Sequence, residues 1–317
     1  MPHFGRIVTS TEEKITREGA KKSRLVKKGD LILSNSMSYG LPYIMGIDGY
    51  IHDGWFVLKD FEDTFDKDYL CNLLISSAIQ NQYKRLAAGG VVQNISSDLV
   101  NSVSVSIPLM EEQKKISSLL NLIDDRIATQ NKIIDKLQSL IKGIAQKIVH
   151  SNKTNVRLSE CLECSSSTLQ ESDVCEHGAY PVYGANGIVG YLDNYNTECE
   201  TVYIIKDGSG VGTVSYVTGK CSATGTLNTL QTKEGYSLQY LYYLLKVFNF
   251  EPYKTGMAIP HIYFKDYGKA KIFCPTYTKQ LQYARLLSAI DKELSAEQRL
   301  LTNLCLQKQY LLRQMFI

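Results

Sequence analysis

The sequence contains a glycine-rich segment that could bind a nucleotide and one His-Asp pair that could act in acid–base catalysis. DGSGVG (207–212) has the spaced glycines of a nucleotide-binding loop. Such a loop leads directly into a helix whose N-terminus holds the phosphates. The residues that follow here, TVSYVTG, favour a strand, so a turn between two strands explains the glycines better. His52 and Asp53 could form an acid–base pair. A structural turn is the better interpretation, because the equivalent positions of the internal repeat described below hold Thr224 and Gly225.

The cysteines offer a second kind of chemistry, which is metal binding. Cys161 and Cys164 form a CxxC pair, with Cys175 and His177 nearby. A zinc site needs four ligands at defined spacing. The other half of the chain carries no matching cluster, so free thiols are favoured and no metal site is expected. The sequence also lacks a Ser/His/Asp order, an HExxH motif and a P-loop, and it offers no convincing catalytic constellation.

The elements that would position any site are repeated along the chain. Residues 107–149 match residues 274–316 without a gap, at an offset of 167 (274 minus 107). Upstream, LILS at 31–34 aligns with YIIK at 203–206. Each half is therefore predicted to be a globular domain followed by a long helix. A protein with two similar halves commonly faces a two-fold partner, such as a DNA duplex.

Both predicted helices carry an apolar seam with alternating spacings of four and three residues, which predicts a coiled coil. The first seam consists of Ile116, Leu120, Ile123, Ile127, Gln130, Ile134 and Leu137, and continues through Ile141, Ile144 and Ile148. The second consists of Tyr283, Leu287, Ile290, Leu294, Glu297, Leu301 and Leu304, and continues through Lys308, Leu311 and Met315. The polar Gln130 and Glu297 occupy the same layer and would fix the register. We expect the helices to pack antiparallel.

The two globular parts mix short β-type runs with one amphipathic helix each. In the second, residues 201–206, 212–217 and 227–232 favour strands and 238–248 favours a helix, while 67–86 favours a helix in the first. The predicted class is α/β (α+β) with twisted β-sheets. The predicted boundaries are 1–106 for the first domain, 107–150 for its helix, 156–273 for the second domain and 274–317 for the last helix.

Charge and apolar content narrow the possible partners and the compartment. The net charge is only +3, but residues 1–30 hold eight Lys/Arg against four acidic residues. Such clusters are typical of phosphate contacts, although a solvated face explains them equally well. No segment approaches the roughly 20 apolar residues of a membrane span, and residues 1–14 contain no apolar signal region. The eight cysteines are expected to be reduced thiols in the cytoplasm.

Several motifs resemble one family over nearly the whole chain. They are Ile107-Pro108, Glu111-Glu112-Gln113, Ile123-Asp124, Gly143 with Gln146-Lys147, VKKGDLILSNS (26–36), GYIHDGWF (49–56), YPVYGANGIVGYLD (180–193) and GTLNTL (225–230). The helix motifs resemble the central conserved region of the specificity (S) subunit of type I restriction–modification systems. The remaining motifs resemble its target-recognition domains.

The resemblance implies a non-catalytic subunit with two target-recognition domains, each reading half of a split site in double-stranded DNA. The long helices would separate the half-sites and dock adenine methyltransferase (M) subunits, which would carry S-adenosylmethionine. A translocating nuclease (R) subunit would join them, and a second copy of the chain is a further candidate partner. The chain starts inside the first recognition domain, so that domain is expected to be incomplete. The alternative is a truncated scaffold that docks methyltransferases but reads a half-site or no site.

Reading a major groove requires donors and acceptors for base edges and cations for phosphates. The candidates in loops of the first domain are Ser34, Asn35, Ser36, Tyr39, Lys84, Arg85, Gln93 and Asn94. Those of the second are Tyr183, Asn186, Lys206, Asp207, Ser209, Lys254 and His261. The alternative for each is a solvated loop residue, and for Asn94 and His261 a cap of the following turn. Candidates for methyltransferase contacts are helix positions expected to be exposed, namely Glu111, Gln113, Arg126, Gln280 and Arg299.

Overall fold

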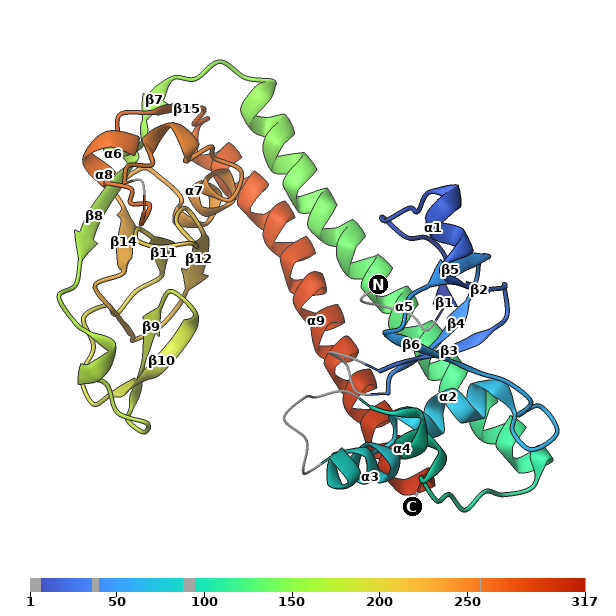
Figure 1. Ribbon diagram of the computed structural model, residues 1–317. Helices are drawn as coiled ribbons and strands as arrows, with labels where there is room; N and C mark the ends of the chain where they lie inside the picture. Colours follow the sequence, from blue (N-terminus) through green and yellow to red (C-terminus); the bar gives the residue numbers. More distant parts are fainter. Residues whose placement is uncertain (1–6, 36–39, 88–94, 257, 317) are drawn as a thin grey trace. The chain divides into compact units, whose positions relative to one another are not determined.

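The computed structural model describes residues 7–35, 40–87, 95–256 and 258–316 (Figure 1). These residues form two compact units. The first combines the residues up to 133 with those from 297 onward, and the second spans residues 134–296. Each unit contains one mixed domain and segments of both long helices, so the predicted mixed α and β class is confirmed.

The domain of the first unit is built on a four-stranded sheet of order β1-β4-β3-β6, in which only β1 and β4 are parallel. The sheet strands are β1 (Ile7–Val8), β3 (Leu31–Ser34), β4 (Pro42–Met45) and β6 (Trp55–Leu58). A separate antiparallel pair comprises β2 (Arg24–Val26) and β5 (Gly49–Ile51). The short helices are α1 (Arg17–Lys21), α2 (Lys67–Ile75), α3 (Ser77–Ala87) and α4 (Ser97–Asn101). Every residue of β3 is buried, which makes this strand the centre of the domain.

The prediction of a single helix over 67–86 is wrong in one respect, because the structure has two helices, α2 and α3, separated at Ser76. The backbone of Ser76 is extended, with φ −64° and ψ 153°. Its hydroxyl accepts a hydrogen bond from the Ile79 amide at 3.4 Å and thereby caps α3. A serine side chain that competes for backbone donors favours such a cap over a continuous helix.

The domain of the second unit has two larger sheets. The antiparallel sheet β12-β11-β14-β8 contains β8 (Leu162–Ser166), β11 (Thr201–Ile205), β12 (Val214–Val217) and β14 (Leu227–Thr232). The sheet β10-β9-β13 contains β9 (Tyr180–Gly184), β10 (Gly187–Leu192) and β13 (Ser222–Ala223). A short pair joins β7 (Val156–Arg157) to β15 (Lys271–Ile272). The helices are α6 (Leu158–Cys161), α7 (Leu238–Leu245) and α8 (Phe264–Tyr267), with 3-10 turns η1 (Glu171–Asp173) and η2 (Glu251–Tyr253).

The long helices are α5 (Met110–His150) and α9 (Tyr277–Met315), and they pack antiparallel as predicted. In the first unit, Gln130 Nε2 donates to the backbone oxygen of Glu297 at 3.1 Å and also to its carboxylate. Farther toward the start of α5, Asp124 pairs with Lys308. Residues nearer the start of α5 thus contact residues nearer the end of α9, as in an antiparallel pair (Figure 1). All the seam positions are buried or half-buried, and the pairing with Asp124 explains the lysine in the second seam.

Candidate nucleic-acid interface

The glycine-rich segment at 207–212 is a turn between two strands, as expected. It joins β11 to β12, which pair antiparallel. The turn closes through the Gly212 amide, which donates to the Ile205 carbonyl at 2.9 Å. Gly208 and Gly212 have φ angles of 93° and 91°, values that favour glycine. No helix starts at these glycines, so the segment lacks the helix N-terminus that would hold a nucleotide phosphate.

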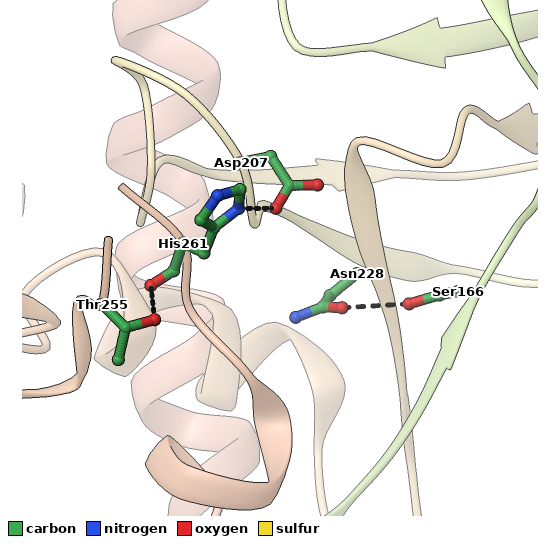
Figure 2. Close-up of polar contacts among 5 residues, drawn as sticks. All are labelled: Ser166, Asp207, Asn228, Thr255 and His261. Carbon is green, nitrogen blue, oxygen red and sulfur yellow. Dashed lines mark hydrogen bonds and ion pairs between the residues drawn. The ribbon is translucent and has the colours of Figure 1, made fainter. Parts of the chain in front are cut away.

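A second loop is joined to this turn by side-chain and backbone bonds. His261 Nδ1 lies 2.6 Å from Asp207 Oδ1, and Figure 2 shows the two side chains facing each other. The Gly208 amide donates to the Pro260 carbonyl at 3.0 Å, and the Ile262 amide donates to the Lys206 carbonyl at 2.9 Å. Two predicted sites that lie 54 residues apart in the sequence therefore form one surface.

The loop that presents His261 is closed by its own bonds. The amides of Thr255 and His261 each donate to the other's carbonyl, at 2.9 and 2.8 Å. Gly256 between them has φ 88°, and a Cβ on it would lie 2.3 Å from the Ile259 carbonyl oxygen. The side chains of His261 and Asp207 are each 35% exposed. The pair is thus accessible to a ligand although its two members already contact each other.

A buried polar cluster that the sequence analysis missed lies in the same domain. Asn228 on β14 is 4% exposed and accepts from the Ser166 hydroxyl at 3.2 Å (Figure 2). Its amide nitrogen donates to the Tyr267 hydroxyl at 3.0 Å. Burial raises the pKa of Tyr267 far above its ordinary value, so this phenol stays neutral. The available signal was an asparagine within LNTLQT, a run that favours a strand, since a buried amide needs partners.

The remaining candidates of the second domain lie on the β9–β10 hairpin, in the glycine turn and at the end of η2. Asn186 is exposed in the two-residue turn of the β9–β10 hairpin, and Tyr183 on β9 packs against Tyr203 with ring centroids 5.6 Å apart. Burial raises the pKa of Tyr183, and the residue lines a cavity of about 440 Å³ between this hairpin and β12. Lys206 is half-exposed and Ser209 exposed in the glycine turn. Lys254 Nζ lies 2.6 Å from Glu251 Oε1, which reduces its availability for a phosphate.

In the first domain the described candidates differ in exposure. Ser34 is only 2% exposed and its hydroxyl accepts from the Leu41 amide at 3.1 Å, so its side chain serves the fold. Asn35 is half-buried, and its Nδ2 donates to the Asp53 carbonyl at 2.6 Å. Lys84 and Arg85 are exposed in the last turn of α3. The others, which lie outside the described residues, are Ser36, Tyr39, Gln93 and Asn94.

His52 belongs to a turn, as the sequence analysis preferred. Its Nδ1 accepts a hydrogen bond from the Gly54 amide at 2.9 Å. Cys161 is buried and Cys164 is half-buried. Within the described ranges no group of three or more His, Cys, Asp or Glu residues could hold a metal ion. No helix among the described residues is long and apolar enough to cross a membrane.

Two of the five helix positions expected to be exposed are buried, which corrects that expectation. Gln113 and Gln280 are 1% and 2% exposed, because each packs against the domain of its own half. Glu111, Arg126 and Arg299 are exposed. The heptad pattern places the glutamines off the seam, but it describes only the contact between the two helices.

Known proteins resemble the chain in sequence over both halves. The family model for the type I restriction modification DNA specificity domain matches twice, at residues 4–139 and 150–304. A putative type I specificity subunit of Mycoplasma genitalium is 24% identical over 265 residues, which cover 75% of this chain and 68% of that protein. The specificity subunit of the Escherichia coli type I restriction enzyme EcoprrI is 26% identical over 112 residues, which cover 35% of this chain and 28% of that protein.

The E. coli subunit and two further curated relatives, both from Haemophilus influenzae, align with this chain over less than a third of their own length. A solved structure of a type I restriction–modification S subunit from M. genitalium shares the fold, with a TM-score of 0.63 at 19% identity, and the match covers 94% of this chain and 85% of that chain. A structure from a study of complex assembly in the type I system matches with a TM-score of 0.57 at 18% identity, over 91% of this chain and 82% of that chain. Because the family model matches in two copies that together span most of the sequence, the chain belongs to the type I restriction–modification DNA specificity family.

Proposed function

We propose that this chain is the DNA-recognition subunit of a type I restriction–modification complex and has no catalysis of its own. The observation that carries the proposal is the repeated specificity domain, in which each copy leads into a long helix. Each domain would read one half of a split site in double-stranded DNA. Adenine methyltransferase subunits with bound S-adenosylmethionine would dock on the helices, and a restriction subunit would join the complex.

In the second domain, the joined loops around Asp207 and His261 support a role in reading bases. Both side chains are partly exposed, and the adjoining turn contributes Lys206 and Ser209. Histidine and carboxylate groups can exchange hydrogen bonds with base edges, and a lysine can contact phosphate. In the first domain, the exposed Lys84 and Arg85 would contact phosphate.

Coexpression with the cognate methyltransferase subunit in a methylation-free host tests the proposal. Long-read sequencing would map N6-methyladenine, and a split motif with two specified halves is the expected result. A palindromic or half-specified motif would favour the alternative in which only one domain reads DNA. Copurification without methylation would favour the truncated scaffold. If the subunits do not copurify and no methylation is found, both readings are refuted.

Exposed apolar residues at equivalent positions of the two helices support methyltransferase docking. Leu119 and Leu286 are 42% and 50% exposed, and Ile133 and Leu300 are 37% and 40% exposed. Both pairs are separated by the repeat offset of 167 (286 minus 119 and 300 minus 133). Exposed apolar side chains that recur in both halves favour two copies of the same partner.

The double variant Leu119→Glu with Leu286→Glu is therefore expected to lose the methyltransferase during purification. A buried interface anchor contributes about 2 kcal/mol or more, which is about 30-fold in Kd. Leu306→Glu is the matched control, because Leu306 is 58% exposed and its repeat counterpart is the polar Ser139. Titration of the purified subunits would measure both affinities. Equal binding by the double variant and the control would exclude this docking face.

A further inference from the structure

Each long helix contains a buried glutamine in its first turn. Gln113 in α5 and Gln280 in α9 occupy the same position of the repeat, since 280 minus 113 is 167. We call these two residues the helix glutamines. Their side chains are 1% and 2% exposed. Burying an amide costs free energy unless its polar atoms are bonded, so its partners indicate its role.

Gln113 joins the first turn of α5 to the domain that precedes it. Its Oε1 accepts from the Asp66 amide at 2.9 Å, and its Nε2 donates to the carbonyls of Thr64 and Pro108, both at 3.0 Å. Asp66 is the N-cap of α2, where its carboxylate accepts from the Tyr69 amide at 2.9 Å. One side-chain amide on the first turn of α5 thus binds the segment before α5 and the segment that leads into α2.

Gln280 makes the same kind of connection in the second unit. Its Oε1 accepts from the Ser237 amide at 2.9 Å, and its Nε2 donates to the Pro275 carbonyl at 2.9 Å. Ser237 is the N-cap of α7, and its hydroxyl accepts from the Tyr240 amide at 3.3 Å. The capping residue is Asp66 in the first half and Ser237 in the second. In both halves its backbone amide donates to the side-chain oxygen of the glutamine.

Two other polar links between helix and domain differ between the two halves. In the first, the Ser117 hydroxyl donates to Asp66 at 2.5 Å and Asn121 Nδ2 donates to Asp68 at 2.9 Å. The equivalent positions in α9 hold Ala284, which has no polar side chain, and Ser288, whose hydroxyl donates to its own helix. In the second half, Tyr243 donates to Asp291 at 3.2 Å. The helix glutamines are a link of the same kind in both halves.

We propose that the helix glutamines are positioning residues that fix the orientation of each recognition domain on its helix. They would thereby set the spacer length between half-sites at which the complex methylates DNA. This inference rests on the proposed function. Successive bases of a strand are about 3.4 Å apart along the duplex, so a small rotation of a domain about its attachment moves its reading loops by one base-pair step.

The variants Gln113→Met and Gln280→Met test this proposal, because methionine keeps a long unbranched side chain but removes the amide. Gln138→Met and Gln282→Met are matched controls, since both glutamines are exposed on the same helices. The assay measures methylation of plasmids whose sites have the cognate spacer or a spacer one base pair longer or shorter. Each test variant is expected to raise the ratio of altered-spacer to cognate methylation at least tenfold over its control. A purely structural role would lower methylation of all sites alike, and an unchanged ratio overturns the proposal.

A measurement without DNA separates this proposal from the proposed function. Nitroxides attached through ketone-bearing amino acids at the exposed positions Lys59 and Leu122 report the distance between the first domain and α5. Ketone chemistry avoids the eight native cysteines. Gln113→Met is expected to broaden the distance distribution, and Gln138→Met is expected to leave it unchanged. An unchanged distance distribution in Gln113→Met overturns the proposal, whatever the methylation assay shows. If the wild-type complex methylates no split site, that result refutes only the proposed function.

Discussion

The variant Leu120→Ala is expected to lose about 2–5 kcal/mol of free energy of unfolding in the first unit, which is the range for truncating a fully buried leucine. Leu120 has no exposed surface. It belongs to the cluster in which Leu73 and Tyr83 of the domain meet Leu311 and Phe316 of the C-terminal segment. The cavity would therefore weaken contacts among three parts of the unit at once. Since whole domains are stable by only about 5–15 kcal/mol, this loss is large.

Trp55 offers a direct measurement of this effect. It is the chain's single tryptophan, it lies on β6, and it packs edge-on against Tyr43 with ring centroids 5.7 Å apart. Its fluorescence during urea denaturation therefore reports the unfolding of the first unit. Leu122→Ala is the control, because Leu122 is 64% exposed and surface changes usually stay within about 0.5 kcal/mol. If both variants unfold at the wild-type midpoint, Leu120 does not hold the three parts together.

The variant His261→Ala is expected to lower methylation of the cognate site about 10-fold to 100-fold, which corresponds to about 1–3 kcal/mol for one base-reading contact. Two effects combine here. The imidazole would no longer be available to a base edge, and the carboxylate of Asp207 would lose its neighbour at 2.6 Å. Because backbone bonds still join the two loops, the domain itself should remain folded.

The discrimination against altered sites is the decisive readout for His261. Sites changed in the half read by the second domain should gain methylation relative to the cognate site, and sites changed in the other half should not. His177→Ala is the matched control, since His177 is an exposed histidine of the same unit. If the His261 variant retains wild-type methylation and selectivity, the loops around Asp207 do not read DNA.

The long helices could be predicted because a heptad seam is a regular spacing of apolar residues that all face the same partner, the other long helix. It failed at Gln113 and Gln280 because each helix also packs against its own domain, along a face that the seam does not describe. The break at Ser76 was missed for a local reason, since a serine that caps one helix also has an acceptable helix propensity.

The loops were harder to predict than the helices. The glycine turn at 207–212 was identified correctly because the residues after it favour a strand. The pairing of Asp207 with His261 could not be predicted, because it joins segments 54 residues apart. Ser34 was selected as a polar residue at the end of a strand, but its burial depends on the packing around β3.

The contact between Gln130 and Glu297 bears on which long helices can pair with each other. These residues hold the same position of the repeat (297 minus 130 is 167), yet they face each other across the antiparallel helices. Two identical copies could place only like with like at this layer. A glutamate on both sides would bring two carboxylates together, whereas an amide opposite a carboxylate supplies a donor and an acceptor. The difference between the copies therefore favours pairing of unlike helices within one chain over pairing of two C-terminal helices from separate chains.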